Sequence, residues 1–221
     1  MHMNSVGFYA LTLVSKTREY DRVYSFHFAS EEPVPFVPGQ YVHLLAPSSP
    51  PGRENVRHLS IASIPEEGPL RFTVDLGSSS DYKKKLAELE VGGQAHLFKV
   101  KGHFVLGETP PSSVVFLAGG IGITPIRSLI GQIEAHRLPV EWRLGHVARG
   151  GFLYQEEVAK FGGSQRRIRR PELAALVEQW TAERPDAIYY VSGSARFVDG
   201  VAAMLRERGI PETAVRIENF E

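Results

Sequence analysis

Cysteine is absent from the 221 residues of this chain. Its absence excludes disulfides, thiolate zinc sites, cysteine-ligated iron–sulfur clusters and cysteine nucleophiles, so any redox chemistry must use an organic cofactor. No apolar run reaches the roughly 20 residues that cross a bilayer, and the first residues lack the apolar stretch of a signal peptide. We therefore expect a cytoplasmic protein without a membrane span.

Net charge is also lacking, because 25 basic residues are matched by 25 acidic ones. This balance removes the broad positive field that nonspecific nucleic-acid binding requires, so no nucleic-acid partner is expected. Hydrophobic residues make up 43% of the chain, which predicts a packed core. The length suits one large domain or two of ordinary size, since domains cluster near about 100–150 residues.

In residues 1–107, apolar side chains tend to recur at every second position, as at Tyr24, Phe26 and Phe28. Residues 70–76 alternate in the same way. Such alternation places one side of a strand in a core and the other in water. Turn-forming clusters separate the runs, among them Pro50-Pro51-Gly52. Several short strands with frequent turns predict an antiparallel barrel or sandwich.

A linker is expected at residues 108–113, and the pattern changes beyond it. Residues 114–118 form an unbroken apolar run, typical of a strand buried on both faces. Helical spacing of apolar residues follows at 126–133, at 173–180 behind Pro171, and at 197–205 before Gly209. Strands are expected between these helices, at 140–147 and 187–191. The order predicts a parallel α/β domain over residues 114–221.

The glycines after the first strand of this second domain form the most informative local motif. Gly119, Gly120 and Gly122 precede Thr124 and Pro125 at the expected start of a helix. Glycines let the backbone approach a ligand, and a helix N-terminus offers unpaired amide donors to a pyrophosphate. Thr124 is expected to cap this helix. The alternative is a glycine turn that serves packing alone, and the third glycine of the dehydrogenase fingerprint is replaced by proline.

Two segments of the first domain also carry candidate cofactor contacts. Arg57 could neutralise a diphosphate, and the hydroxyl of Ser60 could hydrogen-bond a polar ring edge. An ordinary strand with an exposed arginine is the alternative. Ser80 is expected to cap a short helix that begins at Asp81 and to direct its amide donors toward an anion. Within the lysine run that follows, Lys83 is the one candidate for a phosphate contact.

These segments occur in an order that resembles the ferredoxin-NADP reductase-like flavoprotein superfamily, over nearly the whole chain. Six motifs carry the resemblance, namely 36–41 (F-x-P-G-Q-Y), 57–60 (R-x-Y-S), 77–80 (G-x-x-S), 120–125 (G-x-G-x-x-P), 190–194 (Y-V-C-G-P) and 218–220 (E-x-F). The resemblance implies an antiparallel Greek-key β-barrel that binds FAD and a Rossmann-like parallel α/β domain that binds NADP or NAD. It also implies hydride transfer from NAD(P)H to FAD and then electron delivery to an unidentified acceptor, a redox protein or a small molecule.

The resemblance also implies roles for individual residues. Arg57 would bind the FAD diphosphate, Ser60 would contact the flavin near N5, and Ser192 and Glu218 would lie near the nicotinamide. Phe220 would shield one flavin face. The expected catalytic residues are Ser60, Ser192 and Glu218. The expected cofactor-binding residues are Arg57, His58, Leu59, Ser60, Val74, Gly77, Ser80, Lys83, Gly120, Gly122, Thr124, Pro125, Arg149, Ser192, Gly193 and Phe220.

Three departures from the family pattern carry their own expectations. Leu59 stands where an aromatic residue usually stacks on the flavin, so the flavin would be held less tightly. Ser192 replaces a frequent cysteine and keeps a small hydrogen-bonding group. The segment between Tyr154 and Arg167 is short for a helix and a strand, so the sheet is expected to lack a strand there. The cations at Arg149 and downstream favour NADPH over NADH, and the alternative is that these arginines are solvated surface.

Two other functions remain open on the sequence. Weak stacking by Leu59 would suit a flavin reductase that uses flavin as a transient substrate. The chain could also be a noncatalytic dinucleotide-binding or electron-transfer subunit that docks onto a partner.

Overall fold

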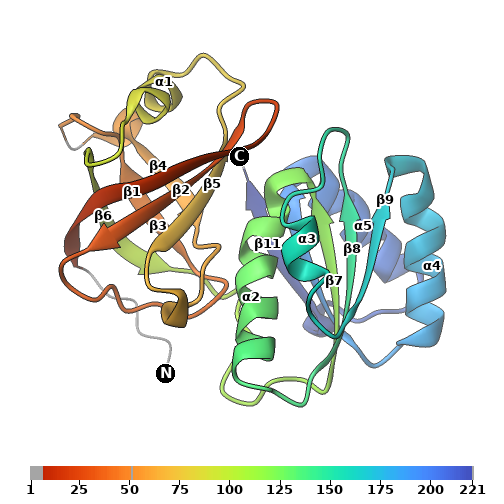
Figure 1. Cartoon of the computed structure of the whole chain (residues 1–221). Helices are drawn as coiled ribbons and strands as arrows, with labels where there is room; N and C mark the ends of the chain where they lie inside the picture. The colour runs from red at the N-terminus through yellow and green to blue at the C-terminus, as the bar shows by residue number, and fades with distance from the viewer. Residues whose placement is uncertain (1–6, 51, 221) are drawn as a thin grey trace. The chain divides into compact units, whose positions relative to one another are not determined.

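The computed structural model describes residues 7–50 and 52–220 of the chain (Figure 1). Contacts divide it between Val105 and Leu106 into two compact units. Pro51, which belongs to an expected turn, lies outside the described residues. So do residues 1–6 of the first expected domain and Glu221 of the second. Among the described residues, no helix is both long and apolar enough to cross a membrane.

The N-terminal unit is a curled antiparallel sheet whose strands follow the order β4-β3-β6-β1-β2-β5. The segment after β4 bonds to β5, where Ala62 N donates to Arg71 O over 2.8 Å. The two ends of the sheet therefore approach each other as in a half-barrel. The elements are β1 (Phe8–Tyr20), β2 (Val23–Ser30), β3 (Tyr41–Leu45), β4 (Val56–Ser60), β5 (Leu70–Asp75), α1 (Asp81–Glu88) and β6 (Gln94–Lys101).

Alternation in the sequence explains this sheet. Phe26 and Phe28 on β2 are fully buried, and Phe72 on β5 joins them in one hydrophobic core. Leu76, which the pattern had included in a strand, lies just past the end of β5. Helix α1 closes the core with Tyr82 and Leu86, and Ser80 caps it as expected by accepting a bond from Lys83 N.

The C-terminal unit is a parallel sheet in the order β11-β10-β7-β8-β9. Figure 1 shows α2 and α3 on one face of this sheet and α4 and α5 on the other. The elements are β7 (Ser113–Gly119), α2 (Ile123–Ala135), β8 (Glu141–Val147), α3 (Gln155–Val158), β9 (Ser164–Ile168), α4 (Leu173–Glu183), β10 (Ile188–Ser194), α5 (Ala195–Glu207) and β11 (Val215–Phe220). The antiparallel and α/β halves expected from the sequence are therefore both present.

Two expectations about this unit are wrong. The sheet keeps its strand between Tyr154 and Arg167, because β9 pairs with β8 over residues 164–168. The segment is short because α3 has only four residues. Thr124 does not cap α2, which follows Gly122 directly. Its hydroxyl instead donates to Ile121 O over 3.0 Å within the first turn.

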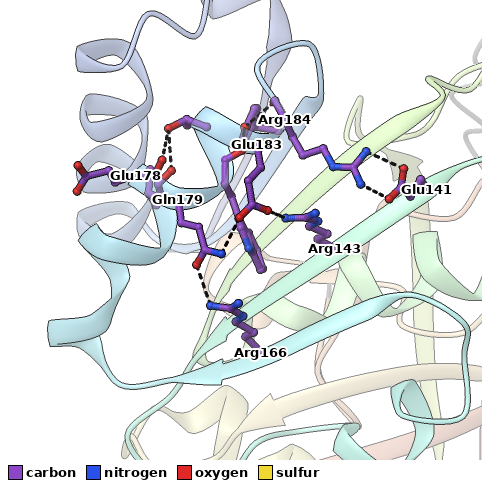
Figure 2. Close-up of polar contacts among 11 residues, drawn as sticks. Glu141, Arg143, Arg166, Glu178, Gln179, Glu183 and Arg184 are labelled. Atoms are coloured by element: carbon purple, nitrogen blue, oxygen red, sulfur yellow. Dashed lines mark hydrogen bonds and ion pairs between the residues drawn. The ribbon is translucent and has the colours of Figure 1, made fainter.

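A network of ion pairs and hydrogen bonds joins α4 to the start of β8 (Figure 2). Glu183 pairs with Arg143 and accepts a bond from Gln179 over 2.7 Å, and Arg166 donates to Gln179 over 2.9 Å. These bonds lower the pKa of the Glu183 carboxyl. Arg184 makes a two-point contact with Glu141. Because Glu141 is the first residue of β8, its pair with Arg184 lies at the amino-terminal edge of the sheet. Gln179 extends the network to Arg166 in the middle of β9.

Candidate cofactor-binding sites

Strand β4 presents the first group of predicted flavin contacts. It lies at the end of the strand order and pairs with β3, with Arg57 opposite Leu44 and Ser60 opposite Tyr41. Ser60 is 5% exposed, and its hydroxyl has no hydrogen-bond partner among the described residues. A buried hydroxyl without a partner is costly unless a ligand supplies one. The Ser60 hydroxyl is therefore suited to hydrogen-bond the polar edge of a bound ring.

Arg57 is held in place by main-chain and aromatic contacts. Its Nη1 donates to Val56 O over 2.7 Å and to Glu54 O over 3.1 Å. Its guanidinium also lies 5.2 Å from the centre of the Tyr82 ring on α1. Tyr82 follows Ser80 by two residues, so the fold brings the predicted diphosphate cation to the capped start of α1. An exposed cation beside the start of a helix suits a diphosphate.

The remaining residues of this group differ in what they can offer. The His58 ring contacts that of His43 at a tilt of 40°, with ring centres 4.2 Å apart, and Leu59 packs against the core of the unit. Val74 is 5% exposed within the same core, so only its main chain is left for a cofactor. Gly77 is exposed and donates its N–H to Asp75 over 2.7 Å. Lys83 is half-buried.

Gly120 and Gly122, in the glycine loop of the second unit, have different structural roles. Gly120 has φ of +57°, a left-handed conformation that favours glycine, and the space beside its Cα is open. A methyl group at Gly122 would lie 2.6 Å from Cα of Gly193 and overlap the main-chain oxygen of Ser192. Gly122 therefore lets the loop pack against the end of β10. Gly120 is the one with room for a ligand.

Ser192 and Glu218 lie side by side on β10 and β11. Ser192 is fully buried, and its hydroxyl, like that of Ser60, lacks a partner within the described ranges. Burial raises the pKa of Glu218 to about 7. The pair thus combines an unpartnered hydroxyl with a carboxyl that titrates near neutral pH. Phe220 follows on β11 opposite Ser194 and is half-buried.

The other predicted nucleotide contacts occupy two environments. Thr124 and Pro125 are buried in the first turn of α2, and because the Thr124 hydroxyl already donates to Ile121 O, its main-chain N–H is the group left for a phosphate. Arg149 is exposed, and its carbonyl accepts a bond of 2.7 Å from Arg169. In the described part of the chain, no hydrogen bond or ion pair engages the side chain of Arg149.

The chain resembles known proteins both in sequence and in structure. No family model matches the chain. The chain is 28% identical over 240 residues to ferredoxin–NADP reductase B of Sorangium cellulosum, with 96% of both chains covered. It is 27% identical over 233 residues to a flavohemoprotein of Pseudomonas putida, with 94% of this chain and 58% of the other covered. The ferredoxin reductase in carbazole 1,9a-dioxygenase superposes with a TM-score of 0.82 at 16% identity, over 98% of this chain and 70% of the other.

The chain is thus similar over most of its length to a ferredoxin–NADP reductase and to flavohemoproteins. This agrees with the resemblance drawn from its six motifs. The chain spans 58–60% of the length of the flavohemoproteins that it matches.

Three side chains of these sites have contacts that the sequence did not predict. Tyr82 orders Arg57, and Phe152 contacts the ring of His146 edge-on at 5.4 Å. His146 itself bonds to the carbonyl of Gly120 over 2.9 Å. A signal was present for His146, because a polar residue at the carboxyl end of a buried strand lies where parallel sheets bind ligands. Tyr82 and Phe152 gave no such signal, since buried aromatic residues ordinarily serve packing.

Proposed function

We propose that this chain binds FAD through its N-terminal unit and NADPH or NADH through its C-terminal unit, and passes a hydride from the nicotinamide to the flavin. The electrons then go to an acceptor, either a redox protein or a small molecule. Support comes from relatives that are named ferredoxin–NADP reductase and flavohemoprotein. When bound, the two cofactors supply the hydride chemistry, and the protein supplies orientation and electrostatics.

The observation that carries this proposal is the pair of buried serines. The hydroxyls of Ser60 and Ser192 are inaccessible and unpartnered within the described residues, and each lies at a predicted cofactor position. Buried polar side chains are almost always hydrogen-bonded, so two exceptions at these places favour ligand contacts. Ser60 would orient the flavin ring, and Ser192 would orient the nicotinamide.

Charged groups complete the proposed roles. Arg57 and the start of α1 would hold the FAD diphosphate, and the amide groups at the start of α2 would hold the dinucleotide pyrophosphate. Glu218 would place a carboxylate beside the nicotinamide. The exposed side chain of Arg149 supports a preference for NADPH, whose extra phosphate attracts a cation.

One experiment tests the flavin half of the proposal. The purified protein should be yellow and should release FAD on denaturation. Arg57→Ala should weaken FAD retention by roughly tenfold, the effect of losing a charge-assisted bond of about 1.5 kcal/mol. Arg53→Ala, at an exposed arginine of the same segment, is the matched control. Equal retention in Arg57→Ala and the parent protein would count against the diphosphate role.

A second candidate function is a reductase that releases its flavin as a product. The half-buried Leu59, which packs against the core, offers no aromatic ring to stack on the flavin and favours this alternative. A colourless purified protein that oxidises NADPH or NADH only when FMN is added would support it. A yellow protein that keeps its flavin through gel filtration would refute it.

A further inference from the structure

His146 occupies a buried position beside the nucleotide loop. It is the second-last residue of β8, paired with Ala118 at the end of β7, and is 3% exposed. The loop begins directly after β7, at Gly120. His146 therefore lies at the carboxyl edge of the sheet, beneath the turn that is predicted to hold the pyrophosphate.

The hydrogen bond of His146 defines its protonation. Nε2 lies 2.9 Å from the main-chain oxygen of Gly120, and a carbonyl oxygen only accepts, so Nε2 carries the proton. Burial lowers the pKa of His146 to about 4, which leaves the imidazole neutral at physiological pH. The edge contact with Phe152 holds the ring at an interplanar angle of 84°. The imidazole thus donates one fixed hydrogen bond, to the loop.

Gly120 is the first residue of a short 3-10 turn, and its side of the loop is open. Its φ of +57° is open to glycine but is not imposed by packing, since a Cβ there would meet no atom within 4 Å. Gly122, two residues later, is fixed by the backbone of Ser192 and Gly193. The bond from the buried His146 holds the carbonyl of the peptide between Gly120 and Ile121 on this open side of the loop. Because that peptide is trans, turning its carbonyl toward His146 turns the N–H of Ile121 the opposite way.

We propose that His146 is a positioning residue for the dinucleotide, whose Nε2–H holds the Gly120 carbonyl and so orients the amide donors of the loop. This inference rests on the proposed function, because it assumes that the loop binds a pyrophosphate. A histidine that merely satisfies the core would contribute to stability and leave nucleotide affinity unchanged.

The test uses the FAD-loaded full chain and two substitutions at one position. His146→Leu removes the donor, and His146→Gln returns an amide donor at a similar reach. Dissociation constants for NADP⁺ and NAD⁺ are measured by calorimetry, together with the KM and kcat of NADPH oxidation. Glu183→Gln, in the network that joins α4 to the start of β8, is the control.

We expect His146→Leu to raise the dissociation constant of the preferred nucleotide and its KM by about tenfold, the loss of one well-aligned hydrogen bond. FAD content and kcat at saturating nucleotide should stay within twofold, and His146→Gln should remain within about threefold of the parent. Glu183→Gln should bind as the parent does. Unchanged affinity in His146→Leu, or equal losses in the Leu and Gln variants, would overturn the inference.

Two further outcomes are informative. If His146→Leu does not fold, Phe152→Leu keeps the imidazole but removes its edge contact. A severalfold weaker affinity then supports the inference, and parental affinity refutes it. If the parent protein binds neither NADP⁺ nor NAD⁺, the proposed function fails, and the role of His146 fails with it. Nucleotide binding by the parent that is indifferent to His146 overturns the inference alone.

Discussion

At the scale of single residues, removing the hydroxyl of Ser60 is the most specific test of the proposed flavin contact. Ser60→Ala removes the proposed contact to the flavin and leaves packing intact. We expect slower flavin reduction by NADPH or NADH, by roughly two- to tenfold, the kinetic equivalent of about 0.5–1.4 kcal/mol. Stopped-flow absorbance measures this rate.

Ser63→Ala is the matched control for Ser60→Ala. Ser63 is also buried, at 2% exposed, but its hydroxyl already accepts a bond of 3.0 Å from Arg71 N. Its loss should lower the free energy of unfolding by about 1 kcal/mol and leave the reduction rate unchanged. Equal reduction rates in Ser60→Ala and the parent would contradict the assigned role of Ser60.

Glu218 gives a prediction about pH. Because burial raises its pKa from 4.5 to about 7, the carboxyl is neutral below pH 7 and ionised above it. The nicotinamide gains positive charge as its hydride leaves, and a nearby carboxylate stabilises that charge. The rate of flavin reduction at saturating nucleotide should therefore rise between pH 6 and pH 8.

Glu218→Gln should flatten that rise and hold the rate near its acid value. Single-turnover rates measured across the same pH range check this. A Gln variant that keeps the parent's rise would show that another group titrates there, and Glu218 would lose its assigned role.

At the scale of elements, the two glycines of the nucleotide loop should respond differently to the same added methyl group. Gly122→Ala forces the loop away from Ser192 and Gly193, and should cost about 2–3 kcal/mol, the range of an overpacked core. Gly120→Ala meets open space and should cost only about 1 kcal/mol for its left-handed backbone. Chemical denaturation of both variants, followed by tryptophan fluorescence, compares the two costs.

Trp142 and Trp180 both lie in the C-terminal unit, so the fluorescence signal reports on the unit that contains the loop. Equal destabilisation by the two substitutions would contradict the division of tasks between Gly120 and Gly122.

How far the sequence predicts these elements depends on the range of the interactions that form them. Periodicity located β2, β7 and α2 because burial on one or both faces leaves a local pattern. The cap at Ser80 was predictable, since its partner is three residues away. The cap at Thr124 was wrong because α2 begins directly after Gly122, whose close approach to the distant Ser192 and Gly193 no local pattern records.

The candidate sites show the same limit. The motifs located Arg57, Ser60 and the glycine loop, but not the side chains that hold them in place. Tyr82 and His146 act through partners 25 and 26 residues away, Arg57 and Gly120. Strand β9 was missed because the helix before it has a single turn, so the segment appeared too short for both elements.

At the scale of the whole molecule, the chain joins a curled antiparallel sheet to a parallel α/β sheet, each with its own predicted cofactor site. Because the chain has no cysteine, the proposed redox chemistry depends on bound organic cofactors. Hydride transfer between those cofactors is the central claim.

The most direct test is an absorption spectrum of the FAD-loaded protein, taken without oxygen before and after adding NADPH and, separately, NADH. We predict that at least one nucleotide bleaches the flavin band, more slowly when its transferred hydrogen at C4 is deuterium. Dithionite serves as the control for a reducible flavin. A flavin that dithionite bleaches but neither nucleotide affects would contradict the account.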